Sequence, residues 1–422
     1  MRQSILCRAA LSLLTLVFAT AVSANHYILP CDNNCIRTAV WVPAGDLNVA
    51  RTGHRAILLQ DGRVLVAGGF GDSKVLAEAE VFDPATRRWT LIPSMNLARK
   101  DHSATLLNDG RVLVVAGVTS SAPPDFGRTA TAEIYDPRTN AWQFTESLPR
   151  SVTGRAAVRL QDGRVLVAGG FPGEPGTLSD GSAQAEIYDP ATGHWDQTGS
   201  LNTGRFWHTL TLLANGEVLA VRGSNDVDLM TTLSSTEIYN PASGQWRVAG
   251  DSGEGSVYHS ATLLPDGKVM VVGGNTGGIG GDLILSSVHL FDPASEKWSD
   301  MPALQAKRYE HSATLLANGD ALIVGGSDQN DHYPNLTYAV GGSVEGFSRA
   351  GGTWGSAPAL NVARSGHTTT LLDDGSILVA GGSILVAGGN QWYDFSQTTS
   401  TEILGLSTIR RRMIEKPLMV PK

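Results

Sequence analysis

Hydrophobic residues along this chain fall in short runs that recur about every 50 residues. In each repeat a run such as HSATLL leads to Asp-Gly or Asn-Gly, and a continuous apolar run such as RVLVAGG follows. A segment of variable length, a run such as AEIYDP and a tryptophan complete the repeat. Asp-Gly and Asn-Gly favour two-residue hairpin turns, and short runs without a 3.6-residue period predict strands. We therefore expect four strands per repeat and almost no helix.

The repeat occurs seven times. Each tryptophan precedes its turn by 20 residues, and the tryptophans are Trp41, Trp89, Trp142, Trp195, Trp246, Trp298 and Trp354. The turns begin at Asp61, Asp109, Asp162, Asn215, Asp266, Asn318 and Asp374. Constant spacing inside the repeat with variable spacing outside it indicates fixed strands and one loop of changing length. Four-stranded units bury both faces when they pack in a ring, so the pattern favours a β-propeller.

The repeat resembles that of the kelch family, which carries a glycine pair after strand two, an aromatic residue in strand three and a tryptophan in strand four. The glycine pairs here begin at Gly68, Gly169, Gly273, Gly325 and Gly381, with Ala116-Gly117 and Arg222-Gly223 in the other two repeats. The strand-three residues are Phe82, Tyr135, Tyr188, Tyr239, Phe291, Phe347 and Leu404. The resemblance covers residues 38–406. It implies an all-β, seven-bladed kelch propeller with four antiparallel strands per blade.

The two ends of the repeat region complement each other. No AEIYDP-like run precedes Trp41, and no tryptophan follows the run at 401–404. We expect the N-terminal strand to be the outer strand of the C-terminal blade, which removes an open sheet edge. The run SILVAGG occurs twice in succession, at 376–382 and 383–389. The first copy keeps the register to Asp374-Gly375, so we assign it to the strand and the second copy to the loop.

The first 24 residues have the pattern of a secretory signal peptide. Arg2 and Arg8 precede an apolar stretch of about a dozen residues, and Val22-Ser23-Ala24 places small residues at a cleavage site. The alternative is a retained membrane anchor, but the stretch is short for a bilayer. In residues 25–37, Cys31 and Cys35 then form a disulfide or, alternatively, bind a metal. We predict an exported protein with a basic tail at 407–422.

Composition narrows the range of partners. The net charge of −8 over 422 residues provides no general basic field for a nucleic-acid backbone. We expect no nucleic-acid partner, no integral membrane contact and a monomer. Copper oxidases that resemble galactose oxidase join a tyrosine to a cysteine, and no cysteine follows residue 35 here. We therefore expect a galactose-oxidase-like ring without the copper site, and no cofactor.

Candidate site residues lie on the face that carries the long loops and the crossovers between blades, where a rigid scaffold usually presents its site. Histidine, arginine and glutamate recur there at equivalent positions of most repeats. A ring of arginines could attract anions, but a group needed in every blade points to a structural role. Residues that interrupt the repeat or lie in the long loops are better candidates: Arg155, Trp207, Arg222, Tyr258, Tyr309, Asp328, His332, Tyr333 and Trp392.

We therefore predict a recognition module that binds a protein or a glycan through the long-loop face. The alternative is a sugar mutarotase or epimerase of the sialic-acid mutarotase type, for which the fold, the export signal and the available arginine, glutamate and histidine groups are suitable.

Overall fold

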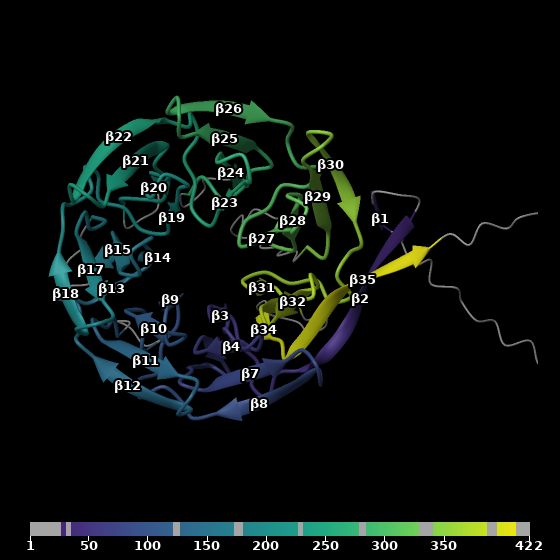
Figure 1. Ribbon diagram of the computed structural model, residues 1–422, viewed down its shortest axis with the longest axis horizontal. Helices are drawn as coiled ribbons and strands as arrows, with labels where there is room; N and C mark the ends of the chain where they lie inside the picture. The colour runs from purple at the N-terminus through teal and green to yellow at the C-terminus, as the bar shows by residue number, and fades with distance from the viewer. Residues whose placement is uncertain are drawn as a thin grey trace, which may run out of the picture.

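Seven sheets form a closed ring around a central axis, six with four strands and one with five (Figure 1). The computed structural model describes residues 27–30, 35–120, 127–172, 180–226, 231–277, 284–328, 341–385 and 395–410. Within these ranges every regular element is a strand, and none of them holds a helix long and apolar enough to cross a membrane. The predicted seven-bladed, all-β propeller is confirmed.

Each blade runs from an inner strand at the axis to an outer strand at the rim, with antiparallel neighbours. Blade one contains β3 (Arg55–Leu58), β4 (Val64–Ala67), β7 (Ala79–Asp83) and β8 (Arg88–Ile92). Blade two contains β9 (Ser103–Leu106), β10 (Val112–Val115), β11 (Ala132–Asp136) and β12 (Ala141–Thr145). Blade three contains β14 (Ala156–Arg159), β15 (Val165–Ala168), β17 (Ala185–Asp189) and β18 (His194–Gln197). Blades four and five contain β19 (Thr209–Leu212), β20 (Val218–Val221), β21 (Ser235–Asn240) and β22 (Gln245–Asp251); β23 (Ser260–Leu263), β24 (Val269–Val272), β25 (Val288–Asp292) and β26 (Lys297–Met301).

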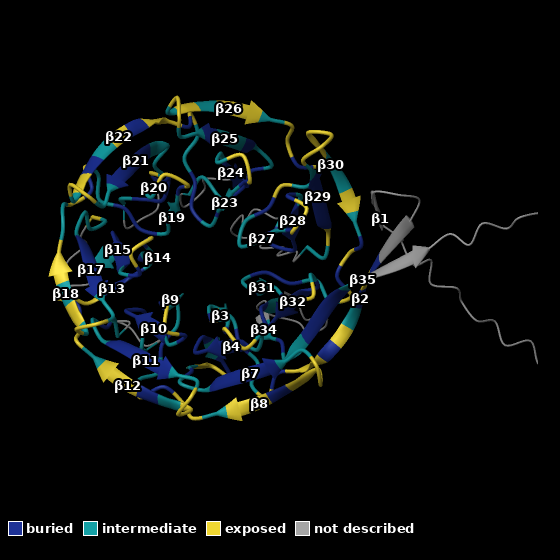
Figure 2. Cartoon of the chain, in the orientation of Figure 1, coloured by how far each residue is buried: buried dark blue, intermediate teal, exposed yellow. Residues whose placement is uncertain are grey.

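Blade six contains β27 (Ser312–Leu315), β28 (Ala321–Val324), β29 (Val344–Ser348) and β30 (Thr353–Ala357). Blade seven combines β31 (Thr368–Leu371), β32 (Ile377–Ala380) and β35 (Ser400–Arg410) with the N-terminal strand β2 (Cys35–Asp46). The second strand of every blade is buried along its whole length, which explains its unbroken apolar sequence (Figure 2).

The hydrophobic core lies between successive blades. Leu65 and Val81 of blade one pack with Val114 and Trp142 of blade two in one cluster, and the same arrangement recurs around the ring. Within a blade, the strand-three aromatic residue pairs with the strand-four tryptophan, with ring centroids 5.0–5.2 Å apart in six blades. The residues that define the repeat are therefore the residues that join its sheets.

The ends of the chain complete one blade, as predicted. Trp41 lies opposite Leu404 and Val42 opposite Ile403 in the antiparallel pairing of β2 with β35. This pairing begins at Cys35 and reaches Arg410, so it extends past the predicted propeller bounds of 38–406. A further strand, β1 (Tyr27–Pro30), pairs with β2 inside the expected N-terminal extension. The backbone hydrogen bonds of two long neighbouring strands thus continue beyond the blade.

The duplicated segment also follows the prediction. The first copy supplies β32, which pairs with β31 and β35. The second copy begins in the loop as β33 (Ser383–Leu385) and pairs with β34 (Phe395–Gln397). The corresponding loop of blade one contains a short ladder of β5 (Phe70–Gly71) with β6 (Lys74–Val75). In blade three, β16 (Phe171–Pro172) of this loop pairs with β13 (Val152–Thr153) of the preceding crossover.

Candidate functional site

A buried arginine–glutamate pair anchors the crossover that enters each of five blades. In blade four, Arg205 donates to Glu237 at 2.8 Å, and both side chains are fully buried. Glu237 also accepts hydrogen bonds from the backbone nitrogens of Asn202 and Thr203. The equivalent pairs are Arg51–Glu80, Arg99–Glu133, Arg308–Glu345 and Arg364–Glu402. The periodic arginines and glutamates are therefore structural, as the repeat argument favoured.

Blade three rebuilds this pair from a different position. Its crossover has Val152 where five other blades have arginine, and Arg155 replaces the usual histidine three residues later. The buried Arg155 guanidinium lies 2.7 Å from Glu186 and donates to the carbonyl oxygen of Gly169. Arg155 was predicted as a binding residue, but the structure gives its head group a framework partner.

Blade five makes a second substitution. Ser256 stands in the arginine position and His289 in the glutamate position. Arg222 fills the space from the neighbouring blade, where its buried guanidinium donates to Ser256 Oγ at 2.9 Å and lies 3.8 Å from Glu254. Glu254 in turn contacts His289 at 3.2 Å. Arg222, predicted as a binding residue because it breaks the repeat, is thus a buried replacement for the missing framework arginine.

Six histidines lie at the start of the inner strands and surround the central axis. Four of them contact the hydroxyl of the first inner-strand residue in the preceding blade: His54 with Thr368, His259 with Thr209, His311 with Ser260 and His367 with Ser312, at 2.8–3.2 Å. The imidazole nitrogens of His102 and His208 lack partners, because Arg55 and Ala156 replace that hydroxyl. Burial lowers the pKa of all six histidines, to about 3 for His259, His311 and His367. At neutral pH this ring is uncharged.

The neutral histidines predict sensitivity to acid. Their folded-state pKa lies below the value of about 6.5 in an unfolded chain, so between pH 6.5 and 3 the unfolded state binds more protons and stability falls as pH falls. At pH 5 each of His259, His311 and His367 is expected to reduce the unfolding free energy by about 2 kcal/mol relative to pH 7. Urea unfolding across this range tests the prediction. Stability that stays flat from pH 7 to 5 would contradict it.

The residue before each of these histidines, and before Arg155, has a left-handed backbone. The seven positions are Gly53, Asp101, Gly154, Trp207, Tyr258, Glu310 and Gly366, with φ between +52° and +65°. Three blades use glycine, which adopts this conformation freely, whereas the other four accept steric strain of about 1–2 kcal/mol per residue. Strained backbones of this kind concentrate at functional sites. We call these seven positions the left-handed ring.

Backbone hydrogen bonds link members of the left-handed ring in neighbouring blades. The donor nitrogens and acceptor oxygens are Asp101 to Gly53, Trp207 to Gly154, Glu310 to Tyr258 and Gly366 to Glu310, at 3.0–3.2 Å. The glycines also leave room for side chains. A Cβ atom on Gly53 would lie 3.0 Å from Asp101 Oδ1, and one on Gly154 would lie 3.0 Å from Trp207 Cδ1. Four side chains are thus held at fixed places around the axis.

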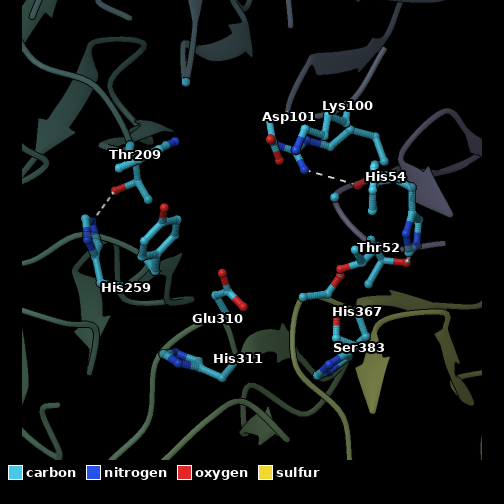
Figure 3. Close-up of a pocket in the computed structure, with 18 of the residues that line it drawn as sticks. Thr52, His54, Lys100, Asp101, Thr209, His259, Glu310, His311, His367 and Ser383 are labelled. Atoms are coloured by element: carbon cyan, nitrogen blue, oxygen red, sulfur yellow. Dashed lines mark hydrogen bonds between the residues drawn. The ribbon is translucent and has the colours of Figure 1, made fainter. Parts of the chain in front are cut away.

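These side chains line a cavity of about 450 Å³ at the axis. Figure 3 shows the carboxylates of Asp101 and Glu310 directed into its open space. Trp207 and Tyr258 also line it, with ring centroids 4.9 Å apart. Lys100 and Arg55 contribute positive charge from blades two and one. A cavity with aromatic walls and a few converging charged groups has the character of a ligand site.

The cavity perturbs the acidity of its own groups. Burial, and then the neighbouring Asp101 carboxylate, raises the pKa of Glu310 to about 7. Burial also raises the pKa of Tyr258 well above its usual value, and Glu310 and Asp101 add to this effect. Perturbed titration of several groups in one cavity marks it as a functional candidate.

The structure gathers only part of the predicted site. Arg155, Trp207 and Tyr258 line the cavity, and Tyr309 lies beside Tyr258 with ring centroids 6.3 Å apart. Asp328 follows β28 and does not line this cavity. His332, Tyr333, Trp392 and Cys31 lie outside the described residues, and only the backbone of Cys35 is described, so the loop and disulfide predictions remain predictions.

Sequence reasoning missed Asp101, Glu310, Lys100 and Arg55. The available signal was the residue before each histidine and before Arg155, which is glycine in three repeats and polar or aromatic in the other four.

The donor set of the cavity does not match the copper centre that its fold suggests. Among the described residues, no three His, Cys, Asp or Glu side chains are grouped to hold a metal ion. Four of the six axial histidines contact hydroxyls of the framework, and the chain lacks a cysteine after residue 35.

Comparisons with known proteins agree on the fold. Two Kelch motif families match residues 51–96 and 256–305. Kelch-like protein 36 of Rattus norvegicus is 27% identical over 273 residues, which is 63% of this chain but 42% of that protein. Kelch-like protein 15 of Homo sapiens is 28% identical over 191 residues, or 40% of this chain and 30% of that protein. The matches therefore span less than half of these relatives.

A solved structure has the same ring at lower sequence identity. It is a fungal alcohol oxidase of the AA5 family in complex with copper, with a TM-score of 0.67 and 18% identity. The similarity covers 87% of this chain and 76% of the oxidase, and it shows the fold alone.

Proposed function

Because the chain is a kelch-repeat β-propeller, we propose that it is an exported recognition module that binds a protein partner, or a glycan, at the left-handed ring. Kelch propellers generally bind proteins, which favours a protein partner. The N-terminal sequence pattern supports export. The observation that carries the proposal is the accumulation of strained, non-glycine side chains at one cavity of an otherwise regular scaffold.

The contrast between framework and ring supports binding at this place. The arginine–glutamate pairs are retained or rebuilt in every blade, even where Arg155 and Arg222 come from new positions. The ring positions differ between blades and place two carboxylates and two aromatic side chains in the cavity. Tryptophan and tyrosine are typical of binding hot spots. The ring positions, which vary between blades, can therefore determine which ligand the cavity binds.

The test is to screen the protein on peptide and glycan arrays. The ligands that bind are then measured again with the variants Trp207→Gly and Tyr258→Gly. Glycine is the residue that three other blades use at this position, so the backbone should tolerate it. We expect each variant to weaken binding at least about tenfold, as hot-spot residues do. A matched control is Trp298→Phe on the outer strand β26, which should leave binding unchanged. Unchanged binding by both ring variants would overturn the proposal.

A second candidate function, sugar mutarotation, is supported by the two carboxyl groups of the cavity. With a pKa of about 7, Glu310 is partly protonated at neutral pH and could donate a proton to a ring oxygen. Asp101, in the same cavity, could accept the proton of the anomeric hydroxyl. Anomer interconversion over a panel of neutral and acidic sugars tests this function, and catalysis lost in Glu310→Gln would favour it over binding alone.

A further inference from the structure

The charged and aromatic groups of the cavity are divided between its two sides. Lys100, Arg55 and Asp101 come from blades one and two, while Trp207, Tyr258 and Glu310 come from blades four to six. Figure 3 shows Glu310 across the open space from Lys100 and Asp101. The second side combines aromatic rings with a carboxyl group and, apart from the engaged Arg155 of blade three, has no cationic lining residue among those described.

The two cationic side chains of the cavity, Lys100 and Arg55, contact an aromatic ring and a backbone carbonyl oxygen. The ammonium of Lys100 lies over the ring of Phe70, 5.1 Å from its centroid. The guanidinium of Arg55 donates to the carbonyl oxygen of His54 at 3.1 Å. Asp101 attracts the Arg55 guanidinium electrostatically, and the Ser365 hydroxyl donates a hydrogen bond to Glu310. Among the described residues no cation is paired with Glu310, so its carboxyl group is open to a cationic ligand.

The surroundings of Glu310 explain why its pKa is raised and what would lower it. Asp101 opposes its ionisation, and the Ser365 hydroxyl only partly offsets this effect. His311 and His367, which line the same cavity, are neutral. Tyr258 is also neutral, since its pKa is raised. Among the described groups facing Glu310, no positive charge lies close enough to pair with it.

We infer that the cavity receives a lysine or arginine side chain presented by a protein partner, with its cation between Glu310 and the aromatic pair of Trp207 and Tyr258. This inference rests on the proposed recognition function and specifies the ligand. Aromatic faces attract cations, and a carboxylate supplies a charge-assisted hydrogen bond. An acidic side chain would instead meet Glu310 and Asp101, both of which repel it once ionised.

The cation and the proton compete for the same carboxyl group. Binding of a lysine or arginine stabilises the ionised form of Glu310, so a proton must leave when the ligand binds below pH 7. Affinity should therefore rise as the pH increases from 6 to 8. The other cations of the lining, Lys100 and Arg55, belong to blades two and one on the opposite side of the cavity.

The experiment measures binding of four amidated tripeptides, Gly-Lys-Gly, Gly-Arg-Gly, Gly-acetyllysine-Gly and Gly-Glu-Gly, by ligand-observed NMR at pH 6 and 8. We expect the lysine or arginine peptide to bind at least about tenfold more tightly than the acetyllysine and glutamate peptides at pH 8. Glu310→Gln should remove this preference and its pH dependence. The matched control Asp196→Asn, an exposed carboxylate on β18, should retain both.

Two outcomes separate this inference from the function on which it rests. Equal or tighter binding of the acetyllysine or glutamate peptide would overturn the cationic ligand, while ring-dependent binding of another array ligand, a glycan included, would leave the recognition function standing. If every array ligand binds all ring variants as tightly as the parent protein, both the cationic ligand and the recognition function at the ring are overturned. Loss of preference in Glu310→Gln counts only if its circular dichroism spectrum matches that of the parent protein. If the variant does not fold, the pH dependence of the parent decides, and a flat profile overturns the inference.

Discussion

Replacement of Glu237 by alanine is expected to lower the free energy of unfolding by about 3–5 kcal/mol, the cost of removing one partner of a buried ion pair. Arg205 would remain fully buried without its counterion. The backbone nitrogens of Asn202 and Thr203 and the side-chain amide of Asn202 would also lose their acceptor. Urea unfolding followed by circular dichroism measures the change.

An exposed ion pair provides the control for Glu237→Ala. Glu296 contacts Arg247 at 2.9 Å, but both side chains are more than one third exposed. Because water screens such pairs, Glu296→Ala should cost less than about 1 kcal/mol. Equal losses in the two variants would show that the buried pairs do not anchor the crossovers.

Trp41→Ala should destabilise the protein by about 3–5 kcal/mol, as is typical of a buried tryptophan. Trp41 packs with Leu360, Val379 and Leu404 in the cluster between blades six and seven. Its indole nitrogen also donates to the carbonyl oxygen of Pro358 at 2.7 Å. The loss would weaken the contact through which the N-terminal strand completes the last blade. Thermal and urea unfolding should both record it.

The neighbouring residue is a matched control, because successive side chains of a strand point to opposite faces. Val40 is 40% exposed on the same strand. Val40→Ala should change stability by no more than about 0.5 kcal/mol. A small effect of Trp41→Ala, similar to that of Val40→Ala, would contradict a structural role for ring closure.

The fold was readable from the sequence because its contacts repeat. Phe82 and Trp89 pair in one blade, and the equivalent aromatic pair recurs in five others, so six copies report one set of local interactions. The pairing of Trp41 with Leu404 followed from what each end of the chain lacks. The extensions of β2 and β35 beyond residues 38–406 were missed, because they belong to no repeat.

Only part of the site could be predicted from the sequence, because a residue that breaks the repeat can have either of two physical roles. Arg155 and Arg222 break the pattern because they restore a missing framework charge, which sequence spacing alone does not reveal. Trp207 and Tyr258 break it because they place aromatic rings in the cavity. Asp101 and Glu310 were overlooked because a carboxylate next to a histidine is ordinary in sequence. The left-handed backbone of Asp101 and Glu310 distinguishes these residues, and only the structure shows it.

The most direct test of the left-handed ring is the free energy of unfolding of Glu310→Gly. If this side chain is kept for binding, its removal relieves the strained backbone at φ +52° and takes away a partly buried carboxyl group that has no cationic partner. Relief of about 1–2 kcal/mol exceeds the cost of about 0.4–1 kcal/mol that glycine adds through the unfolded chain. We predict a variant as stable as the parent or more stable by up to about 1 kcal/mol. A loss of more than about 1 kcal/mol would show that Glu310 serves the fold and would contradict the account.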